Sequence, residues 1–305
     1  MSKKLKGNVI LLITAVIWGT SFVAQSEGMN FVQPFTFNAL RTLAGGVVLV
    51  PVILAFNQPW KKNKKRKYSL KYTFIGGAVC GCALCAASSL QQYGIVHTTA
   101  GKSGFITALY VIIVPFFEMI LGRRQGVKIW LCAFTAIVGF GLLCIKGDLT
   151  VGLGDWLTLA CAPIFAIQII CVDRFLERGA DGVMMACVQF FTAGLIMLLC
   201  MLMFETPDIS RIWDAKGTIL YAGVMSCGVA YTLQIVGQRY AAPTIATLLM
   251  SLESVFAALS GWLILGENLS PKELLGCCLV FAAVVFSQVN LPTIKFKNKR
   301  KGVKE

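Results

Sequence analysis

The feature that most constrains the fold is a series of apolar runs, each about 20 residues long, that recur along the whole sequence. A run of this length crosses the ~30 Å hydrocarbon core of a bilayer as an α-helix. Hydrophobic residues make up 57% of the 305 residues and charged residues only 14%. A soluble domain carries roughly 25% charged residues. We therefore predict an all-α integral membrane protein.

Polar breaks divide the sequence into ten predicted transmembrane helices. Their expected ranges are 8–26, 34–56, 72–96, 98–121, 127–145, 154–175, 182–204, 217–239, 242–265 and 272–290. No small-residue cleavage site follows the first run, which begins at Val9, so we expect it to remain as a helix rather than act as a signal peptide. An even number of crossings places both termini on the same side of the membrane.

Lysine and arginine are unevenly distributed between the two sides of this predicted topology. If the N-terminus is cytoplasmic, most of the 28 basic residues lie on inner segments, with clusters at 61–71 and 295–304. The outer segments then hold only Lys146, Arg211, Lys216 and Lys272. The positive-inside rule therefore predicts a multi-pass protein of a bacterial cytoplasmic membrane with both termini in the cytoplasm. The basic clusters are expected to contact anionic lipid rather than nucleic acid, because no aromatic platform accompanies them.

The two halves of the sequence resemble each other. Residues 89–100 align with 232–243, which pairs Gln91 with Gln234, while 119–130 align with 263–274 and 7–19 with 154–166. Five helices per half is an odd number, so the second copy must be inserted upside down. We expect a first repeat at 1–146, a second at 147–293 and a basic cytoplasmic tail at 294–305. Inverted repeats of this kind are typical of secondary transporters, which hold substrate near the bilayer midplane.

Longer motifs resemble the drug/metabolite transporter superfamily, in its ten-helix branch with two EamA domains. They are "AVIWGTSFVAQ" (15–25), "FTFNALR" (35–41), "TTAGKSGFITALYVIIVP" (98–115), "SCGVAYTLQIVGQ" (226–238) and "SLESVFAALSGWLILGE" (251–267). The resemblance implies a central cavity surrounded by helices 1, 3, 4, 6, 8 and 9. It also implies transport of amino acids, metabolites, nucleotide sugars or drugs, often outward. The family often has a proline after the position of Glu253, whereas this chain has Ser254, so the resemblance gives no basis for a kink there.

Polar residues recur at helical spacing within the apolar runs. In the first run Thr14, Trp18, Ser21 and Gln25 share one face. Such residues either line a cavity or hydrogen-bond neighbouring helices to each other, and the spacing alone leaves both interpretations open. The residues that we predict to line a substrate cavity are Trp18, Ser21, Gln25, Arg41, Gln91, Lys102, Tyr110, Tyr231, Gln234, Ser251 and Glu253.

Glu253 is the charged residue expected nearest the bilayer midplane. An ionisable group at that depth costs several kilocalories per mole unless it has a partner or water. Three interpretations remain open: a substrate-contacting or proton-carrying group, an ion-pair partner of Arg41 or Lys102, and a protonated, hydrogen-bonded group. On a continuous helix Glu253 borders the stripe of Ser251 and Ser254 rather than centring it.

The preferred function is a secondary transporter that moves a small amino-acid-like or organic-acid metabolite by alternating access, with export as the expected direction and proton coupling as an added expectation. The alternatives are a multidrug or nucleotide-sugar carrier on the same scaffold, a lipid flippase and a channel. An enzyme is not expected, because His97 is the single histidine and no HExxH or GxSxG motif lies within a run. We expect no cofactor and no metal.

Overall fold

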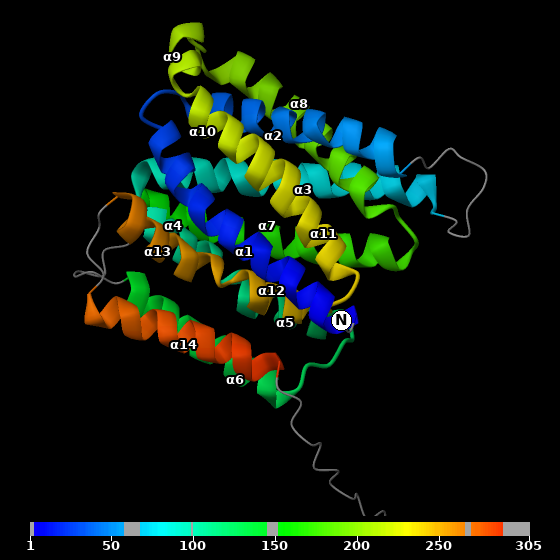
Figure 1. Ribbon diagram of the computed structural model, residues 1–305, viewed down its shortest axis with the longest axis vertical. Coiled ribbons are helices and arrows are strands. Elements are labelled where there is room, and N and C mark those ends of the chain that lie inside the picture. Colours follow the sequence, from blue (N-terminus) through cyan, green and yellow to red (C-terminus); the bar gives the residue numbers. More distant parts are fainter. Residues whose placement is uncertain (1–2, 58–67, 99, 145–151, 266–269, 289–305) are drawn as a thin grey trace, which may run out of the picture.

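The computed structural model describes residues 3–57, 68–98, 100–144, 152–265 and 270–288, which are helical and contain no β-strand (Figure 1). The elements of the first half are α1 (Lys3–Gly28), α2 (Pro34–Val52), η1 (Ile53–Asn57), α3 (Leu70–His97), α4 (Ala100–Thr107), α5 (Tyr110–Ile120) and α6 (Val127–Cys144). Those of the second half are α7 (Leu153–Glu177), α8 (Gly182–Phe204), α9 (Ile209–Asp214), α10 (Lys216–Leu220), η2 (Tyr221–Tyr231), α11 (Thr232–Gln238), α12 (Pro243–Met250), α13 (Glu253–Leu265) and α14 (Pro271–Gln288).

The membrane character that the sequence predicts is confirmed. Eight helical segments of the described chain are long and apolar enough to cross a bilayer, and two further apolar helices, Val127–Leu142 and Leu274–Ser287, are shorter. Every predicted run coincides with one helix or with consecutive helical pieces. The count of ten crossings stays a prediction, because it depends on the two shorter helices. Most of the basic clusters 61–71 and 295–304 lie outside the described residues.

Contacts at the helix ends show that the second half runs opposite to the first. The end of α3 meets the start of α7, where Thr98 Oγ1 donates to Asp155 Oδ1 at 2.8 Å. The end of α3 also lies beside the end of α1, because Gln92 Nε2 donates to the carbonyl oxygen of Gln25. Helix α7 therefore begins where α1 finishes. We call this side the Glu205 end, because Glu205 lies there, and the opposite side the Arg123 end.

The two halves also pack on each other in matching ways. Helix α3 lies along α7 and, correspondingly, α1 lies along η2 and α11 (Figure 1). A Cβ atom added to Gly7 would lie 2.6 Å from the Cβ of Tyr240, and one added to Gly154 would lie 2.7 Å from the carbonyl carbon of His97. The alignment of the halves pairs Gly7 with Gly154 and His97 with Tyr240. Equivalent glycines therefore allow equivalent close approaches, as an inverted repeat requires.

Helices α6 and α14 form a separate pair on one side of the molecule (Figure 1). Their outward faces carry large apolar side chains, among them Phe134 and Phe281, which are 65% and 58% exposed. A soluble protein rarely exposes apolar patches of this extent. We expect these faces to contact lipid.

Two predicted helices are interrupted at equivalent places. The fourth breaks at Ala108 and Leu109, between α4 and α5, and the ninth breaks at Ser251 and Leu252, between α12 and α13. Both breaks are tightened turns with hydrogen bonds between residues three apart, as from Leu109 N to the Ile106 oxygen and from Leu252 N to the Leu249 oxygen. Short 3₁₀ turns inside a helix often mark a hinge. The ninth helix is thus interrupted without a proline.

Candidate substrate-binding pocket

A pocket with a volume of about 40 Å³ lies where the interrupted helices meet α1, α2, α7, η2, α11 and the last third of α3. Its lining is mostly polar or aromatic rather than aliphatic. The residues are Trp18, Phe22, Gln25, Arg41, Gln91, Thr107, Tyr110, Phe165, Gln168, Ile169, Ser226, Tyr231, Gln234 and Glu253. We call this the central pocket.

The lining of the central pocket follows the internal symmetry of the chain. Gln91 and Gln234, which the sequence alignment pairs, both line it. The same offset pairs Tyr110 with Glu253, and these side chains contact each other directly: Tyr110 Oη donates to Glu253 Oε1 at 2.8 Å. Contact between equivalent positions indicates that the axis relating the two halves passes through the pocket.

Glu253 is the first residue of α13, directly after the interruption. Its side chain is buried, with 4% of the residue exposed. The N-terminus of a helix carries partial positive charge and favours a carboxylate. The interruption therefore provides both the position of Glu253 and a favourable local field, while Tyr110 supplies a hydrogen bond.

Arg41 approaches the same pocket from α2 and is also buried, with 5% of the residue exposed. Its Nε donates to Asn38 Oδ1 at 2.9 Å, and Asn38 Nδ2 in turn donates to the Ser88 carbonyl oxygen at 3.0 Å. The guanidinium also lies over the ring of Phe37, 5.6 Å from its centre. Within the described residues no ion pair joins Arg41 to Glu253, so a buried basic group and a buried acidic group line one pocket separately.

Glutamine amides form a further part of the lining. Gln168 Nε2 donates to Gln189 Oε1 at 3.1 Å, and Gln234 Nε2 lies 3.5 Å from Gln168 Oε1. On the other side Gln91 Nε2 donates to Thr107 Oγ1 at 3.0 Å. A glutamine amide has an NH2 donor and a carbonyl acceptor. When one of the two is hydrogen-bonded within the protein, the other can still bind a ligand.

Eight of the eleven predicted cavity residues line this pocket. They are Trp18, Gln25, Arg41, Gln91, Tyr110, Tyr231, Gln234 and Glu253. Ser21 and Ser251 lie outside the lining: both are fully buried, and the Ser251 hydroxyl donates to the Leu248 carbonyl oxygen at 2.9 Å. The side chain of Lys102 lies outside the described part of the structure.

Several lining residues were missed by sequence reasoning, namely Phe22, Thr107, Phe165, Gln168, Ile169 and Ser226. The internal repeat contained the signal for two of them. It pairs Phe165 with Trp18 and, extended along the same helix, Gln168 with Ser21. Reading each candidate together with its counterpart in the other half would have identified both.

A larger, open cavity of about 640 Å³ lies at the Arg123 end, and we call it the vestibule. Its lining comes from the end of α7, the start of α12 and the connecting segments beside them. The residues are Tyr68, Arg123, Asp173, Leu176, Glu177, Gly179, Ala180, Gln238, Arg239, Tyr240, Ala241, Ala242 and Pro243. In the described part of the chain no group of His, Cys, Asp and Glu side chains is arranged to hold a metal ion.

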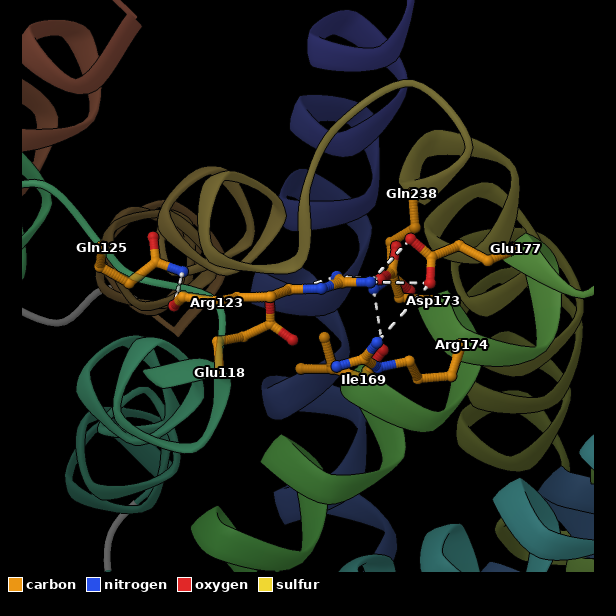
Figure 2. Close-up of polar contacts among 8 residues, drawn as sticks. All are labelled: Glu118, Arg123, Gln125, Ile169, Asp173, Arg174, Glu177 and Gln238. Carbon is orange, nitrogen blue, oxygen red and sulfur yellow. Dashed lines mark hydrogen bonds and ion pairs between the residues drawn. The ribbon is translucent and has the colours of Figure 1, made fainter. Parts of the chain in front are cut away.

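An ion-pair cluster stands in the vestibule wall (Figure 2). Arg123, in the segment between α5 and α6, places Nη1 2.8 Å from Asp173 Oδ2 and 3.3 Å from Glu118 Oε2. Its Nη2 lies 2.7 Å from each carboxylate oxygen of Glu177. The hydrogen bond to Asp173, reinforced by all three carboxylates, raises the pKa of Arg123 above its ordinary value. Because Asp173 and Glu177 belong to α7, the cluster connects the two halves.

The vestibule and the central pocket are neighbours along two helices. Ile169 of α7 and Gln234 of α11 line the pocket, and the residues one turn further on, Asp173 and Gln238, line the vestibule. Between them Gln238 Nε2 donates to the Ile169 carbonyl oxygen at 3.1 Å. This hydrogen bond joins α11 to α7 at the boundary between the two cavities.

This arrangement defines a membrane protein with a polar site between two inverted halves, which is the architecture of a secondary transporter. The sequence profile of the EamA-like transporter family matches residues 5–145 and again residues 152–288. The chain belongs to the EamA-like transporter family.

Several similar proteins are named as transporters or exporters. An uncharacterized transporter of Archaeoglobus fulgidus is 28% identical over 287 residues, which cover 93% of this chain and 86% of the relative. The threonine/homoserine exporter RhtA of Escherichia coli is 26% identical over 295 residues, covering 93% of this chain and 91% of the exporter. A solved crystal structure aligns with a TM-score of 0.72 at 17% identity, over 92% of this chain and 96% of that chain, and supports the fold alone.

Proposed function

We propose that the protein is a secondary transporter that exports a small amino-acid-like solute across the cytoplasmic membrane. In this proposal the halves 1–146 and 147–293 alternate in giving each side access to the central pocket. The observation that carries the proposal is that Arg41 and Glu253 line one buried pocket without pairing with each other. Two unpaired opposite charges suit a ligand that has both.

The chemistry of the two charged groups favours a zwitterion. The fork of an arginine side chain binds a carboxylate in a bidentate manner. Arg41 donates to Asn38 only through Nε, and its two terminal nitrogens are left to bind a ligand. Glu253 uses one oxygen for Tyr110 and keeps the other for an ammonium group. An organic acid without an amine would leave Glu253 as an uncompensated charge, and for this reason we place amino acids first.

The volume of the central pocket supports a mechanism with moving halves. About 40 Å³ is far below the roughly 300 Å³ of a ligand site of ordinary size, so a solute can enter only after the lining separates. The interruptions that begin α5 and α13 lie directly at the pocket and can act as hinges. The large vestibule at the Arg123 end gives a solute access from that side.

The charges at the Arg123 end support its assignment to the cytoplasm. Arg174 lies in the last turn of α7, and further arginines follow helices that finish there: Arg123, Arg124, Arg178 and Arg239. By the positive-inside rule this end faces inward, which puts both termini in the cytoplasm and directs the vestibule toward solute to be exported. The name of the relative RhtA, a threonine/homoserine exporter, agrees with this direction and with the solute class.

The first test is transport of amino acids by the purified protein in proteoliposomes. A thermal-shift screen of the common amino acids selects the substrate, with L-threonine as the starting candidate because of RhtA. In vesicles where the protein is inserted in both orientations, we expect uptake of the amino acid. When a proton gradient is imposed, we expect the amino acid to accumulate inside. Loss of the screen response for every amino acid, with a response to nucleotide sugars, cationic drugs or lipids instead, would assign a different substrate class.

Variants of the two charged groups test the site itself. Arg41→Met and Glu253→Gln are each expected to reduce transport at least tenfold while the protein stays folded, since each removes a charged hydrogen-bond partner worth about 1.5–3 kcal/mol. Measuring Glu253→Gln at several pH values tests proton coupling. Unchanged transport with an unchanged pH profile would remove Glu253 from the mechanism. Accumulation of the solute against its own gradient would exclude a channel.

A further inference from the structure

The vestibule carries the same three kinds of polar group as the central pocket. The pocket combines an arginine, a carboxylate and a glutamine of α11. In the vestibule the corresponding groups are Arg123, Asp173 and Gln238. Gln238 follows the pocket glutamine by one helical turn, so the two sets lie in sequence along the same helices. This repetition raises the question of whether the vestibule binds the same kind of molecule.

Gln238 has an oxygen without a partner. The residue is only 3% exposed, and its Nε2 donates to the Ile169 carbonyl oxygen. That donation fixes which end of the amide is the nitrogen, and the remaining Oε1 has no hydrogen-bond donor within the described structure. A buried acceptor of this kind costs free energy unless a ligand or water supplies a donor. Because Gln238 lines the vestibule, a donor can reach it from there.

The two terminal nitrogens of Arg123 have different partners: Nη2 binds a single carboxylate, and Nη1 binds two. Nη2 makes two 2.7 Å contacts with Glu177. Nη1 is shared between Asp173 at 2.8 Å and Glu118 at 3.3 Å. Figure 2 shows the extended Arg123 side chain reaching from its own segment to the carboxylates of α7. A ligand can therefore take over the Nη1 side while Glu177 keeps the guanidinium in place.

The other charged groups that face the vestibule are already engaged. Arg239 donates to the Tyr68 hydroxyl at 3.3 Å and to the Ala180 carbonyl oxygen at 3.4 Å. Arg174 lies beside the cluster but outside the vestibule lining, 3.9 Å from Glu177. Neither contact involves Asp173, so the Arg123–Asp173 pair is the one that an incoming ligand would exchange.

We propose that the vestibule contains a second binding site for a zwitterionic amino acid, formed by Arg123, Asp173 and Gln238. The ammonium group takes the place of Nη1 on Asp173 and donates to Gln238 Oε1. The carboxylate accepts from the released Nη1 of Arg123. Asp173 and Nη1 of Arg123 each exchange one charged partner for another, so the solute can insert into this ion pair without leaving either of the two groups unpaired. The inference rests on the proposed function, since it assumes an amino-acid substrate.

Binding at this site has a mechanical consequence. Arg123 belongs to the first half and Asp173 to the second, so the solute replaces a direct contact between the halves with one through itself. The boundary between the two cavities lies about one helical turn, roughly 5 Å, beyond Asp173 and Gln238, at Ile169 and Gln234, and the solute crosses it on its way to Arg41 and Glu253. The Gln238–Ile169 hydrogen bond is the contact that must open for this step. The vestibule site thus loads the pocket from the cytoplasmic side.

The test counts bound amino acid on the full-length protein in nanodiscs. Equilibrium dialysis with labelled L-threonine, or with the amino acid that gives the largest thermal shift, is expected to find two molecules per protein. Arg41→Met should leave one, because it disables only the central pocket. Adding Asp173→Asn to Arg41→Met should weaken the remaining binding about tenfold or more. Adding Glu177→Gln instead is the comparison variant, since it removes a charge from the anchor of the same guanidinium but leaves the exchanged Arg123–Asp173 pair intact, and it should weaken the remaining binding less than Asp173→Asn does.

The outcomes separate this site from the proposed function. One molecule per protein, lost entirely with Arg41→Met, would overturn the vestibule site and leave the central pocket intact. Equal weakening by Asp173→Asn and Glu177→Gln would show that the cluster acts only structurally. No amino-acid binding by the unaltered protein would overturn the proposed substrate class and the vestibule site together. The counts on the unaltered protein and on Arg41→Met need no change in the vestibule, so they decide the matter even where Asp173→Asn fails to fold.

Discussion

Glu205 offers the sharpest stability prediction, because its carboxylate makes three short hydrogen bonds between the two halves at the end opposite the vestibule. It follows α8, and its oxygens accept hydrogen bonds from Phe35 N, Thr36 N and Thr36 Oγ1, each at 2.7 Å. These donors belong to the first turn of α2. The carboxylate therefore caps a helix of the other half and meets the positive end of its dipole.

The expected loss follows from the groups that Glu205→Ala leaves without a partner. Each unsatisfied backbone N–H costs about 1–3 kcal/mol, and the lost interaction with the helix dipole adds about 0.3–1 kcal/mol. Phe35 is only partly buried, so water reaches one of the two N–H groups, which places the sum near about 3 kcal/mol. Glu205→Gln keeps one acceptor oxygen and should lose about half as much.

The assay is thermal unfolding in mild detergent, followed with a thiol-reactive dye that reports exposure of buried free cysteines such as Cys80 and Cys161. At roughly 2 °C per kcal/mol, Glu205→Ala should lower the melting temperature by about 6 °C. Asp208→Ala is the matched control, because this exposed carboxylate caps only α9 through Ser210 N. A shift for Glu205→Ala no larger than that of Asp208→Ala would refute the reasoning.

Three further predictions concern packing, the central pocket and the vestibule. Gly154→Ala should destabilise the protein by about 1–3 kcal/mol, because its Cβ would press on the backbone of α3, whereas Gly217→Ala, in helix α10 with open space around it, should not lower the melting temperature. Tyr110→Phe should cut transport about tenfold with little change in expression, since it removes the hydrogen bond to Glu253, and full activity would show that the bond is dispensable. Arg123→Met should lower the melting temperature by a constant amount from about pH 6 to pH 9. The raised pKa keeps Arg123 charged over this range, and its contribution to stability is lost only above that pKa. A difference in melting temperature that disappears by pH 9 would contradict this.

Much of the architecture could be predicted from the sequence because membrane insertion depends on local patterns. Each apolar run must satisfy its own backbone hydrogen bonds, so its length and composition alone predict a helix. Gln91 and Gln234, which the alignment of the two halves pairs, both line the central pocket in the structure. Spacing along one helix was enough to place Trp18 and Gln25 at that pocket.

The same local reasoning reached its limit where helices meet. Ser21 shares a face with Trp18 and Gln25, yet it lies outside the lining, because the contacts of α1 with its neighbours decide which part of that face meets the pocket. A helical wheel placed Glu253 at the border of the stripe formed by Ser251 and Ser254. The interruption before Glu253 starts a new helix, so the angles of a continuous wheel do not apply.

By itself, the sequence determined the membrane class, the helical segments, the internal repeat and the presence of a few buried charges, since each of these is written in residues close together along the chain. Only the tertiary structure decided that Arg41 and Glu253 share a pocket without pairing. It also decided that Tyr110 hydrogen-bonds Glu253, the equivalent position of the second half, and that Arg123 of one half binds Asp173 of the other. The physical reason is that such meetings depend on the relative rotation and approach of helices. Close contacts at small residues far apart in sequence, such as Gly7 against Tyr240, set these quantities, and no single segment encodes them.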